Sequence, residues 1–167
     1  MKLRALGALA GLLLCVALPS PAQTGPAAPS IWLPQADGTP TGLRDLRGQV
    51  VLVDFWASWC APCLKSLPQL EGWYGELRAR GFTVLAVNVD TERKKALAFL
   101  KRKPVRYPVV YDAEGWWPEQ YGVGGMPASY LVDRQGRLRQ SYSGYSEKDL
   151  PRIRRDVEAL LAEGETR

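Results

Sequence analysis

Two cysteines separated by two residues are the clearest candidates for chemistry in this chain. Cys60 and Cys63 enclose the dipeptide Ala61-Pro62 and follow an apolar run. Such a pair can bind a metal, form a structural disulfide, or cycle between dithiol and disulfide. A permanent disulfide at this spacing closes a very small loop and would restrict the unfolded chain little. The spacing therefore favours redox cycling.

The composition argues against a metal site. A structural zinc site uses four ligands, usually cysteine and histidine. The chain has three cysteines and no histidine, so carboxylates would have to complete a tetrahedral site. At 167 residues the chain is also long enough to bury a core without disulfides. We therefore expect a functional disulfide, with no metal and no organic cofactor.

The position of the pair suggests how the two sulfurs divide the work. Cys60 stands where a strand ends and a helix begins, and the unpaired amides and dipole of a helix N-terminus stabilise a thiolate there. In Cys-x-x-Cys motifs the thiol pKa falls to about 3.5–7.5. We expect Cys60 to be the nucleophile and Cys63, one turn on and more buried, to resolve the mixed disulfide. Pro62 suits the first turn, where its missing N–H costs nothing.

Hydrophobic periodicity predicts an α/β fold around this pair, with a sheet covered on both faces. One helix is expected to run through Pro68, which should kink it, and to stop at Gly81. Ser146, with Asp149 three residues on, is an N-cap signal for the last helix. The predicted elements are strands at 49–56, 82–89 and 107–111, helices at 61–80 and 92–103, a hairpin of strands 127–132 and 137–142, and a C-terminal helix.

The N-terminus predicts export. Lys2 and Arg4 precede an apolar run of 14 residues, and small residues follow at 20–22. This pattern predicts a signal peptide over residues 1–22, and the run is short for a membrane span of about 20 residues. We expect a linker over 23–30 and a single domain over 31–167.

Two other interpretations of the N-terminus remain open. The segment could stay uncleaved as a membrane anchor, or Cys15 could be a lipoprotein cysteine, although the bulky Leu14 before it disfavours that. Removing residues 1–22 lowers the net charge from +5 to +3, a mild excess that does not indicate nucleic-acid binding. It also leaves Cys60 and Cys63 as the remaining cysteines, in a compartment where they stay a disulfide or cycle.

Three segments resemble the thioredoxin superfamily, and in particular its exported TlpA/ResA-like branch. "VVLVDFWASWCAPC" resembles the active-site strand and turn, and "IWLPQADGTPTGLRDLRGQ" resembles the branch's N-terminal strands. "YGVGGMPASYLVDRQGRL" resembles the loop that ends in a cis-proline and is followed by a strand and hairpin. The likeness extends from Ser30 to about Leu161. It implies a thioredoxin-like fold with a central mixed sheet and a short N-terminal β extension.

The resemblance also implies an activity and a set of site residues. The protein is expected to be a periplasmic or otherwise extracytoplasmic thiol-disulfide oxidoreductase, acting as a monomer. Cys60 and Cys63 match the redox pair, and Pro127 matches the cis-proline after Met126, whose backbone would bind an extended client. With Trp59 and Pro62, these two residues form the implied substrate-binding set.

The resemblance further implies the partners. The clients would be proteins with disulfides or thiols, apocytochrome c among them, and a membrane thiol-disulfide protein would donate electrons. The Ala61-Pro62 dipeptide lacks the histidine of strongly oxidising Cys-Pro-His-Cys proteins, which favours a reductant. The motif itself does not fix the direction, because direction depends on the partners' potentials.

An acid interrupts the apolar strand before the motif. If Asp54 is buried, its pKa should be raised and it could move protons for Cys63, as the acid at this place does in thioredoxins. Alternatively, strand alternation turns it towards solvent. ResA-like proteins often have a glutamate three residues after the second cysteine, where this chain has Ser66. If an acid takes part, Asp54 must supply it.

The sequence also allows other functions, and it contains a basic stretch and a tryptophan pair outside the motif. A client-binding module with a locked disulfide is the alternative function, while Ala57 disfavours a peroxidase because that class needs Thr or Ser there. The basic stretch 93–103 is expected to be a solvated helix face, with docking to an acidic partner as the alternative. Trp116 and Trp117 are expected to pack, although an exposed pair could mark a partner surface.

Overall fold

The computed structural model describes residues 25–144 and 146–165. The signal peptide predicted over 1–22 lies outside these residues. Within the two described ranges, no helix is both long enough and apolar enough to cross a membrane.

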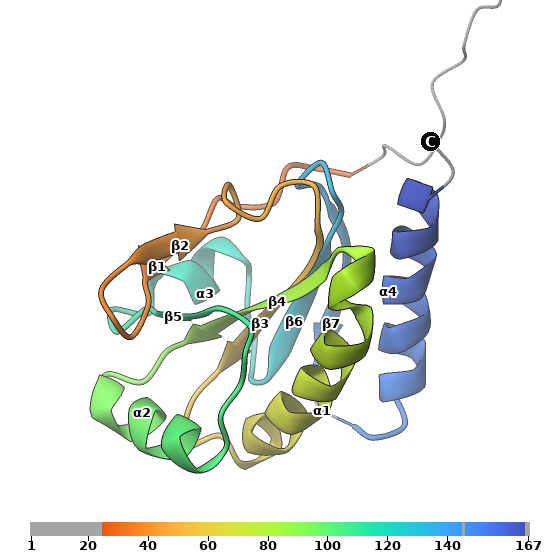
Figure 1. The fold of residues 1–167 in the computed structure, drawn as a ribbon. Coiled ribbons are helices and arrows are strands. Elements are labelled where there is room, and N and C mark those ends of the chain that lie inside the picture. Colours follow the sequence, from red (N-terminus) through yellow and green to blue (C-terminus); the bar gives the residue numbers. More distant parts are fainter. Residues whose placement is uncertain (1–24, 145, 166–167) are drawn as a thin grey trace, which may run out of the picture.

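A five-stranded mixed sheet forms the centre of the fold (Figure 1). Its strands lie in the order β5-β4-β3-β6-β7. The first three run parallel, whereas β6 and β7 are each antiparallel to their neighbours. The bounds are β3 Val50–Trp56, β4 Phe82–Asn88, β5 Val109–Tyr111, β6 Ala128–Val132 and β7 Leu138–Ser143. The predicted α/β fold with a mixed sheet is confirmed.

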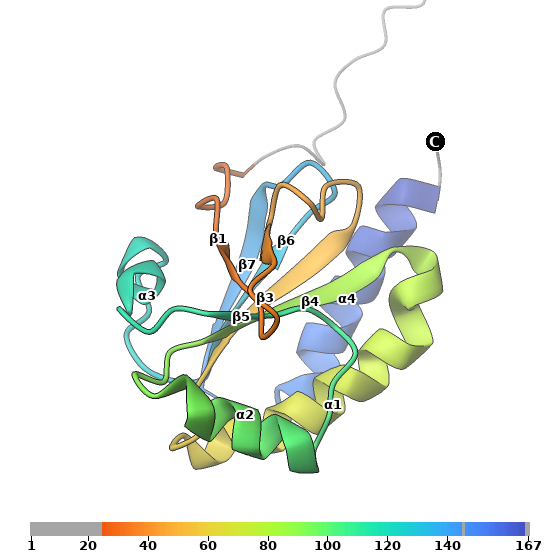
Figure 2. The ribbon, with the colours of Figure 1, turned by 60° about the vertical axis from the view of Figure 1, so that its left-hand side comes forward.

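Helices pack on both faces of the sheet (Figure 2). Apolar side chains of three helices form one core with alternate residues of β3 and β4: α1 Ala61–Leu77, α2 Arg93–Arg102 and α4 Leu150–Glu165. A second core lies on the opposite face, beneath α3 Trp116–Gln120 and an N-terminal hairpin of β1 Trp32–Pro34 and β2 Pro40–Gly42. Both faces of β3 are therefore covered, and all seven of its residues are buried.

The parallel strands place the redox motif. β3 and β4 pair in register, with Trp56 opposite Asn88 at their carboxyl ends. The chain leaves β3 at this edge, makes a turn closed by a hydrogen bond from Cys60 N to Ala57 O (3.1 Å), and enters α1. Loops that follow neighbouring parallel strands share this edge, so residues after β4 can reach the motif.

Several boundaries differ from the sequence-based prediction. The helix predicted over 61–80 is α1 followed by a 3₁₀ turn, Arg78–Arg80, and Gly81 ends it with φ 88°. α1 continues through Pro68, and the kink expected there stays a prediction. β5 is shorter than predicted, since it begins at Val109. Tyr107 lies before it and donates its hydroxyl to Leu67 O of α1.

Two helix starts were also mispredicted. α3, which begins at Trp116, was not predicted. It is only five residues long, too short for a periodic pattern. Ser146 Oγ accepts from Lys148 N in the turn before α4 (3.2 Å), so its side chain caps that turn and not the helix.

The segment expected to be a linker is bonded to the domain over its described part. Ala28 N donates to Gly136 O (3.0 Å) and Leu138 N donates to Pro26 O (2.9 Å). Tyr121 donates its hydroxyl to Pro29 O (2.8 Å). Residues 26–29 therefore lie along the domain, and the boundary at residue 31 stays a prediction.

Candidate active site

Cys60 and Cys63 form a disulfide at the start of α1, with their Cα atoms 5.3 Å apart. Cys60 is the N-cap residue, with an extended backbone (φ −88°, ψ 93°), and Pro62 follows in the first turn. Cys63 is fully buried, while Cys60 keeps 5% of its surface exposed. Cys60, at the helix terminus, is thus the more accessible residue of the pair.

The helix N-terminus provides a favourable electrostatic environment for a thiolate on Cys60. The backbone N–H of Cys63 donates to Cys60 Sγ at 3.3 Å. The first turn of α1 contains no acidic residue that would oppose a negative sulfur. A sulfur aligned with an unpaired amide at the positive end of a helix dipole has a lowered pKa when reduced.

Asp54 is buried in β3, with 1% of its surface exposed. Alternation along the strand places it, with Leu52, on the face covered by α1 and α4, so the solvent-facing alternative is wrong. Burial raises the pKa of Asp54 to about 7, because desolvation penalises the charged carboxylate. Ser129 of β6 donates its hydroxyl to Asp54 Oδ1 (2.7 Å), which opposes part of that rise.

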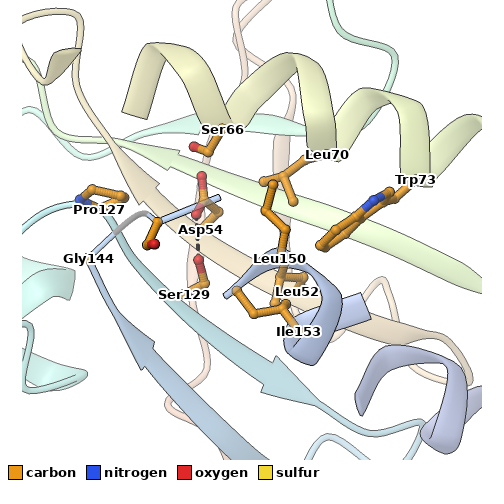
Figure 3. Close-up of a pocket in the computed structure, with 11 residues that line it drawn as sticks. Leu52, Asp54, Ser66, Leu70, Trp73, Pro127, Ser129, Gly144, Leu150 and Ile153 are labelled. Atoms are coloured by element: carbon orange, nitrogen blue, oxygen red, sulfur yellow. Dashed lines mark hydrogen bonds between the residues drawn. The ribbon is translucent and has the colours of Figure 1, made fainter. Parts of the chain in front are cut away.

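A small cavity of about 20 Å³ is lined in part by Asp54. Figure 3 shows the carboxyl group of Asp54 between the hydroxyls of Ser66 and Ser129. Asp54 Oδ2 is buried and has no hydrogen-bond partner among the residues that the structure describes. The volume suits a single water molecule, which needs about 10–15 Å³. Ser66, which lines the cavity, donates to Cys63 O (2.9 Å) and so connects it with the redox pair.

The other predicted site residues lie around this centre to different degrees. The peptide bond between Met126 and Pro127 is cis, as predicted. Pro127 lines the cavity beside Asp54, and Met126 packs against the core cluster that contains both cysteines. Trp59 projects outwards, with 68% of its surface exposed.

Sequence reasoning missed Asp90. Its buried carboxylate, just past the end of β4, accepts hydrogen bonds from Ser58 N (2.9 Å) and Ser58 Oγ (2.8 Å). The available signal was its position, because two polar residues, Asn88 and Asp90, end an otherwise apolar strand next to the one that carries the motif.

Some side chains of the basic stretch and of the tryptophan pair make contacts within the domain. Lys94 and Lys95 pair with Glu92 (2.9 and 2.5 Å), and Arg93 stacks 4.4 Å over the ring of Tyr111. Trp117 packs against the core beneath α3, whereas Trp116 is exposed. Neither feature contacts the cysteines through any interaction found in the described part of the chain.

Comparison with known proteins places this geometry among thiol-disulfide proteins. The Redoxin family matches residues 23–161. The chain is 31% identical over 125 residues to the thiol-disulfide oxidoreductase ResA of Geobacillus thermodenitrificans, covering 75% of this chain and 72% of that protein. It is 30% identical over 142 residues to ResA of Bacillus subtilis, covering 85% and 78%.

Solved structures agree. A putative thiol:disulfide interchange protein DsbE from Chlorobium tepidum superposes with a TM-score of 0.80 at 39% identity, covering 82% of this chain and 96% of that one. The thioredoxin domain of a thiol-disulfide oxidoreductase from Bacteroides vulgatus gives a TM-score of 0.71 at 28% identity, covering 80% and 97%.

Proposed function

The chain belongs to the Redoxin family, as a ResA-like thiol-disulfide oxidoreductase of the thioredoxin superfamily, and from this premise we propose that it reduces client disulfides through Cys60 and Cys63. The observation that carries the assignment of roles is the position of Cys60. Its sulfur lies at the N-terminus of α1 and accepts the N–H of Cys63, and Cys60 is the more exposed residue of the two.

The proposed reaction transfers two electrons from the protein to the client. The thiolate of Cys60 attacks one sulfur of a client disulfide, and the client's other sulfur leaves as a thiolate. Cys63 then loses its proton and attacks Cys60 Sγ. This step forms the Cys60–Cys63 disulfide and releases the client as a dithiol. A thiol donor, proposed to be a membrane protein, restores the reduced pair.

Asp54 is proposed to accept the proton of Cys63. A carboxyl group with a pKa of about 7 can both take and return a proton near neutral pH. The cavity is lined by Asp54 and Ser66, and Ser66 donates its hydroxyl to the backbone carbonyl of Cys63, so polar groups extend from Asp54 to the turn of α1 that carries this cysteine. Ser66 cannot itself replace a carboxylate as the acid.

Clients are proposed to bind across the exposed edge of the motif. Trp59 offers an exposed aromatic surface, Pro62 lies exposed beside the sulfurs, and the Met126–Pro127 loop supplies backbone for an extended segment. Clients would include apocytochrome c, whose cysteines must be reduced before haem attachment. The protein would act as an exported monomer after removal of residues 1–22, or from an uncleaved anchor.

Insulin reduction tests the activity. The purified protein with dithiothreitol should accelerate precipitation of the insulin B chain well above the rate with dithiothreitol alone. A variant carrying Cys60→Ser and Cys63→Ser serves as the control and should give the background rate. Equal rates for the two proteins would refute reductase activity and favour a client-binding module with a locked disulfide.

A further inference from the structure

The turn that precedes Cys60 is held by a buried carboxylate for which the exchange reaction has no role. Asp90 is 3% exposed and accepts three hydrogen bonds. Two come from Ser58, one from its backbone N–H to Oδ2 (2.9 Å) and one from its hydroxyl to Oδ1 (2.8 Å). The third comes from Asn88 Nδ2 to Oδ2 (2.8 Å). Both oxygens are therefore engaged, and one residue of the motif loop receives two of the three contacts.

The parallel pairing of β3 and β4 places these groups together. Trp56 and Asn88 are opposite each other at the strand ends, and Val89 N continues the pairing by donating to Trp56 O (3.0 Å). Asn88 Oδ1 accepts from Asp90 N (3.2 Å), which holds the carboxylate towards the neighbouring loop. The clamp on Ser58 thus joins the two loops that leave the paired ends of β3 and β4.

The clamped residue is close to the nucleophile. Ser58 lies inside the turn from Ala57 to Cys60, and Cys60 ends this turn as the N-cap of α1. Two peptide units separate Ser58 from Cys60, so their Cα atoms are at most about 7.6 Å apart. Asp90 therefore holds the backbone two residues before Cys60 and places its carboxylate against the loop that carries this cysteine.

Nearby cations do not neutralise this charge through a direct ion pair. Among the described residues, no basic group forms a salt bridge with Asp90. Glu92, whose carboxylate pairs with the Lys95 ammonium at 2.5 Å, is the main cause of the raised pKa of Lys95, and the charge of Asp90 adds a smaller contribution. Lys95 of α2, which is itself paired with Glu92, is thus the charged group whose interaction with Asp90 is resolved among the described residues.

We infer that Asp90 is a positioning residue that also sets the reducing strength of the cysteine pair, by holding the turn before Cys60 and by placing a charge that opposes the thiolate. The disulfide is uncharged, whereas the reduced pair carries a thiolate once Cys60 ionises. A neighbouring carboxylate raises the free energy of the charged form alone. It therefore raises the thiol pKa and shifts the equilibrium towards disulfide, which makes the pair a stronger reductant. The inference rests on the proposed role of Cys60 as nucleophile.

The isosteric change Asp90→Asn tests this. The amide keeps the shape and one acceptor oxygen but removes the charge. In a Cys63→Ser background, where Cys60 is the thiol under study, the Cys60 pKa should fall by about one unit, the order of magnitude of a charge effect inside a protein. With both cysteines present, and at a pH above that pKa, the equilibrium with glutathione should shift about tenfold towards the dithiol, or about 30 mV. The ultraviolet absorbance of the thiolate and thiol trapping provide the two readouts.

Two further variants separate charge from packing. Ser58→Ala removes one hydrogen bond but keeps the carboxylate, so the Cys60 pKa should not fall. Asp112→Asn is the matched control, because Asp112 is a buried carboxylate at the end of the next strand out, bonded to Trp117 N (2.8 Å), and it should leave the pKa unchanged.

The inference is overturned if Asp90→Asn leaves the Cys60 pKa unchanged or raises it, or if Asp112→Asn produces the same fall. Failure of the proposed function is a separate result, since it would appear as a wild-type protein that does not exchange disulfides. The difference in pKa between Asp90→Asn and the parent would still be measurable in that case.

Discussion

At the scale of single residues, the site combines a sulfur at a helix terminus with a carboxyl group in the core. The two sulfurs are bonded to each other, and the burial of each differs in the direction that the proposed roles require. Asp54 is the residue of the site whose protonation the fold changes most clearly, because burial raises its pKa from the ordinary 3.8 to about 7.

The burial of Asp54 has a consequence for stability. Because its pKa is higher in the folded state than in the unfolded state, the folded protein retains a proton between about pH 4 and 7 that the unfolded chain has lost. The unfolding free energy should therefore fall as pH rises through this window, by on the order of 4 kcal/mol, and level off above it. Asp54→Asn should remove this dependence. Urea unfolding of the oxidised protein across the window measures it, and equal slopes for both proteins would contradict the assignment.

The hydroxyl of Ser129 should tune Asp54. It donates to the carboxylate and so lowers the Asp54 pKa against the effect of burial. Ser129→Ala should raise that pKa by about one unit, the value of a hydrogen bond to a charged group. Ser66→Ala is a suitable comparison, because Ser66 donates to Cys63 O and not to Asp54. Nuclear magnetic resonance titration of the Asp54 carboxyl carbon measures the Asp54 pKa in both variants. A lower Asp54 pKa in Ser129→Ala than in the parent protein would contradict the prediction.

At the scale of elements, α1 carries both cysteines, and a side chain from outside the helix is hydrogen-bonded to its backbone. Tyr107, just before β5, is buried and donates its hydroxyl to Leu67 O of α1 (3.1 Å). Burial raises the Tyr107 pKa far above its ordinary value, so this hydroxyl remains a donor at every physiological pH. This hydrogen bond links α1, the helix that carries the cysteines, to the segment that leads into the edge strand β5.

Loss of that bond should weaken the domain. Tyr107→Phe removes the buried hydroxyl and should lower the unfolding free energy by about 1 kcal/mol. The adjacent Tyr74, whose ring contacts Tyr107 edge-on and whose hydroxyl has no protein partner in the described ranges, provides a matched control. Tyr74→Phe should change stability by only a few tenths of a kcal/mol. Chemical denaturation measures both, and equal losses would show that the bond contributes nothing.

Element prediction from the sequence succeeded where a long apolar pattern exists. The run through β3 and the stripes of α1, α2 and α4 are long enough to repeat, so their type and order could be predicted. α3, five residues long, was not predicted, and β5, three residues long, was predicted with its start two residues too early, because elements of that length are determined by tertiary contacts. At Ser146 a capping residue lay one turn too early, because a turn uses the same side-chain chemistry as a helix start.

At the scale of the whole molecule, the site depends on contacts that no local pattern encodes. The redox pair and the cis bond before Pro127 could be predicted because each belongs to a short motif. The partners of Asp54 and Ser58 could not, since Ser129 is 75 positions from the former and Asp90 is 32 positions from the latter. Only the strand order β4-β3-β6 places these hydroxyls and carboxylates together. The fold thus supplies the polar surroundings of a motif that is itself local.

The central claim is that Cys60 attacks clients and Cys63 releases them, and trapping of mixed disulfides tests it most directly. Cys63→Ala and Cys60→Ala, expressed as full-length proteins, are compared after acid quenching and thiol blocking on non-reducing gels. The account predicts that Cys63→Ala accumulates mixed disulfides with clients that dithiothreitol reduces. The attacking thiol of Cys60 remains in this variant, but no second thiol is present to resolve the mixed disulfide. Cys60→Ala should accumulate none. Adducts on Cys60→Ala but not on Cys63→Ala would reverse the roles, and adducts on neither would contradict the exchange mechanism.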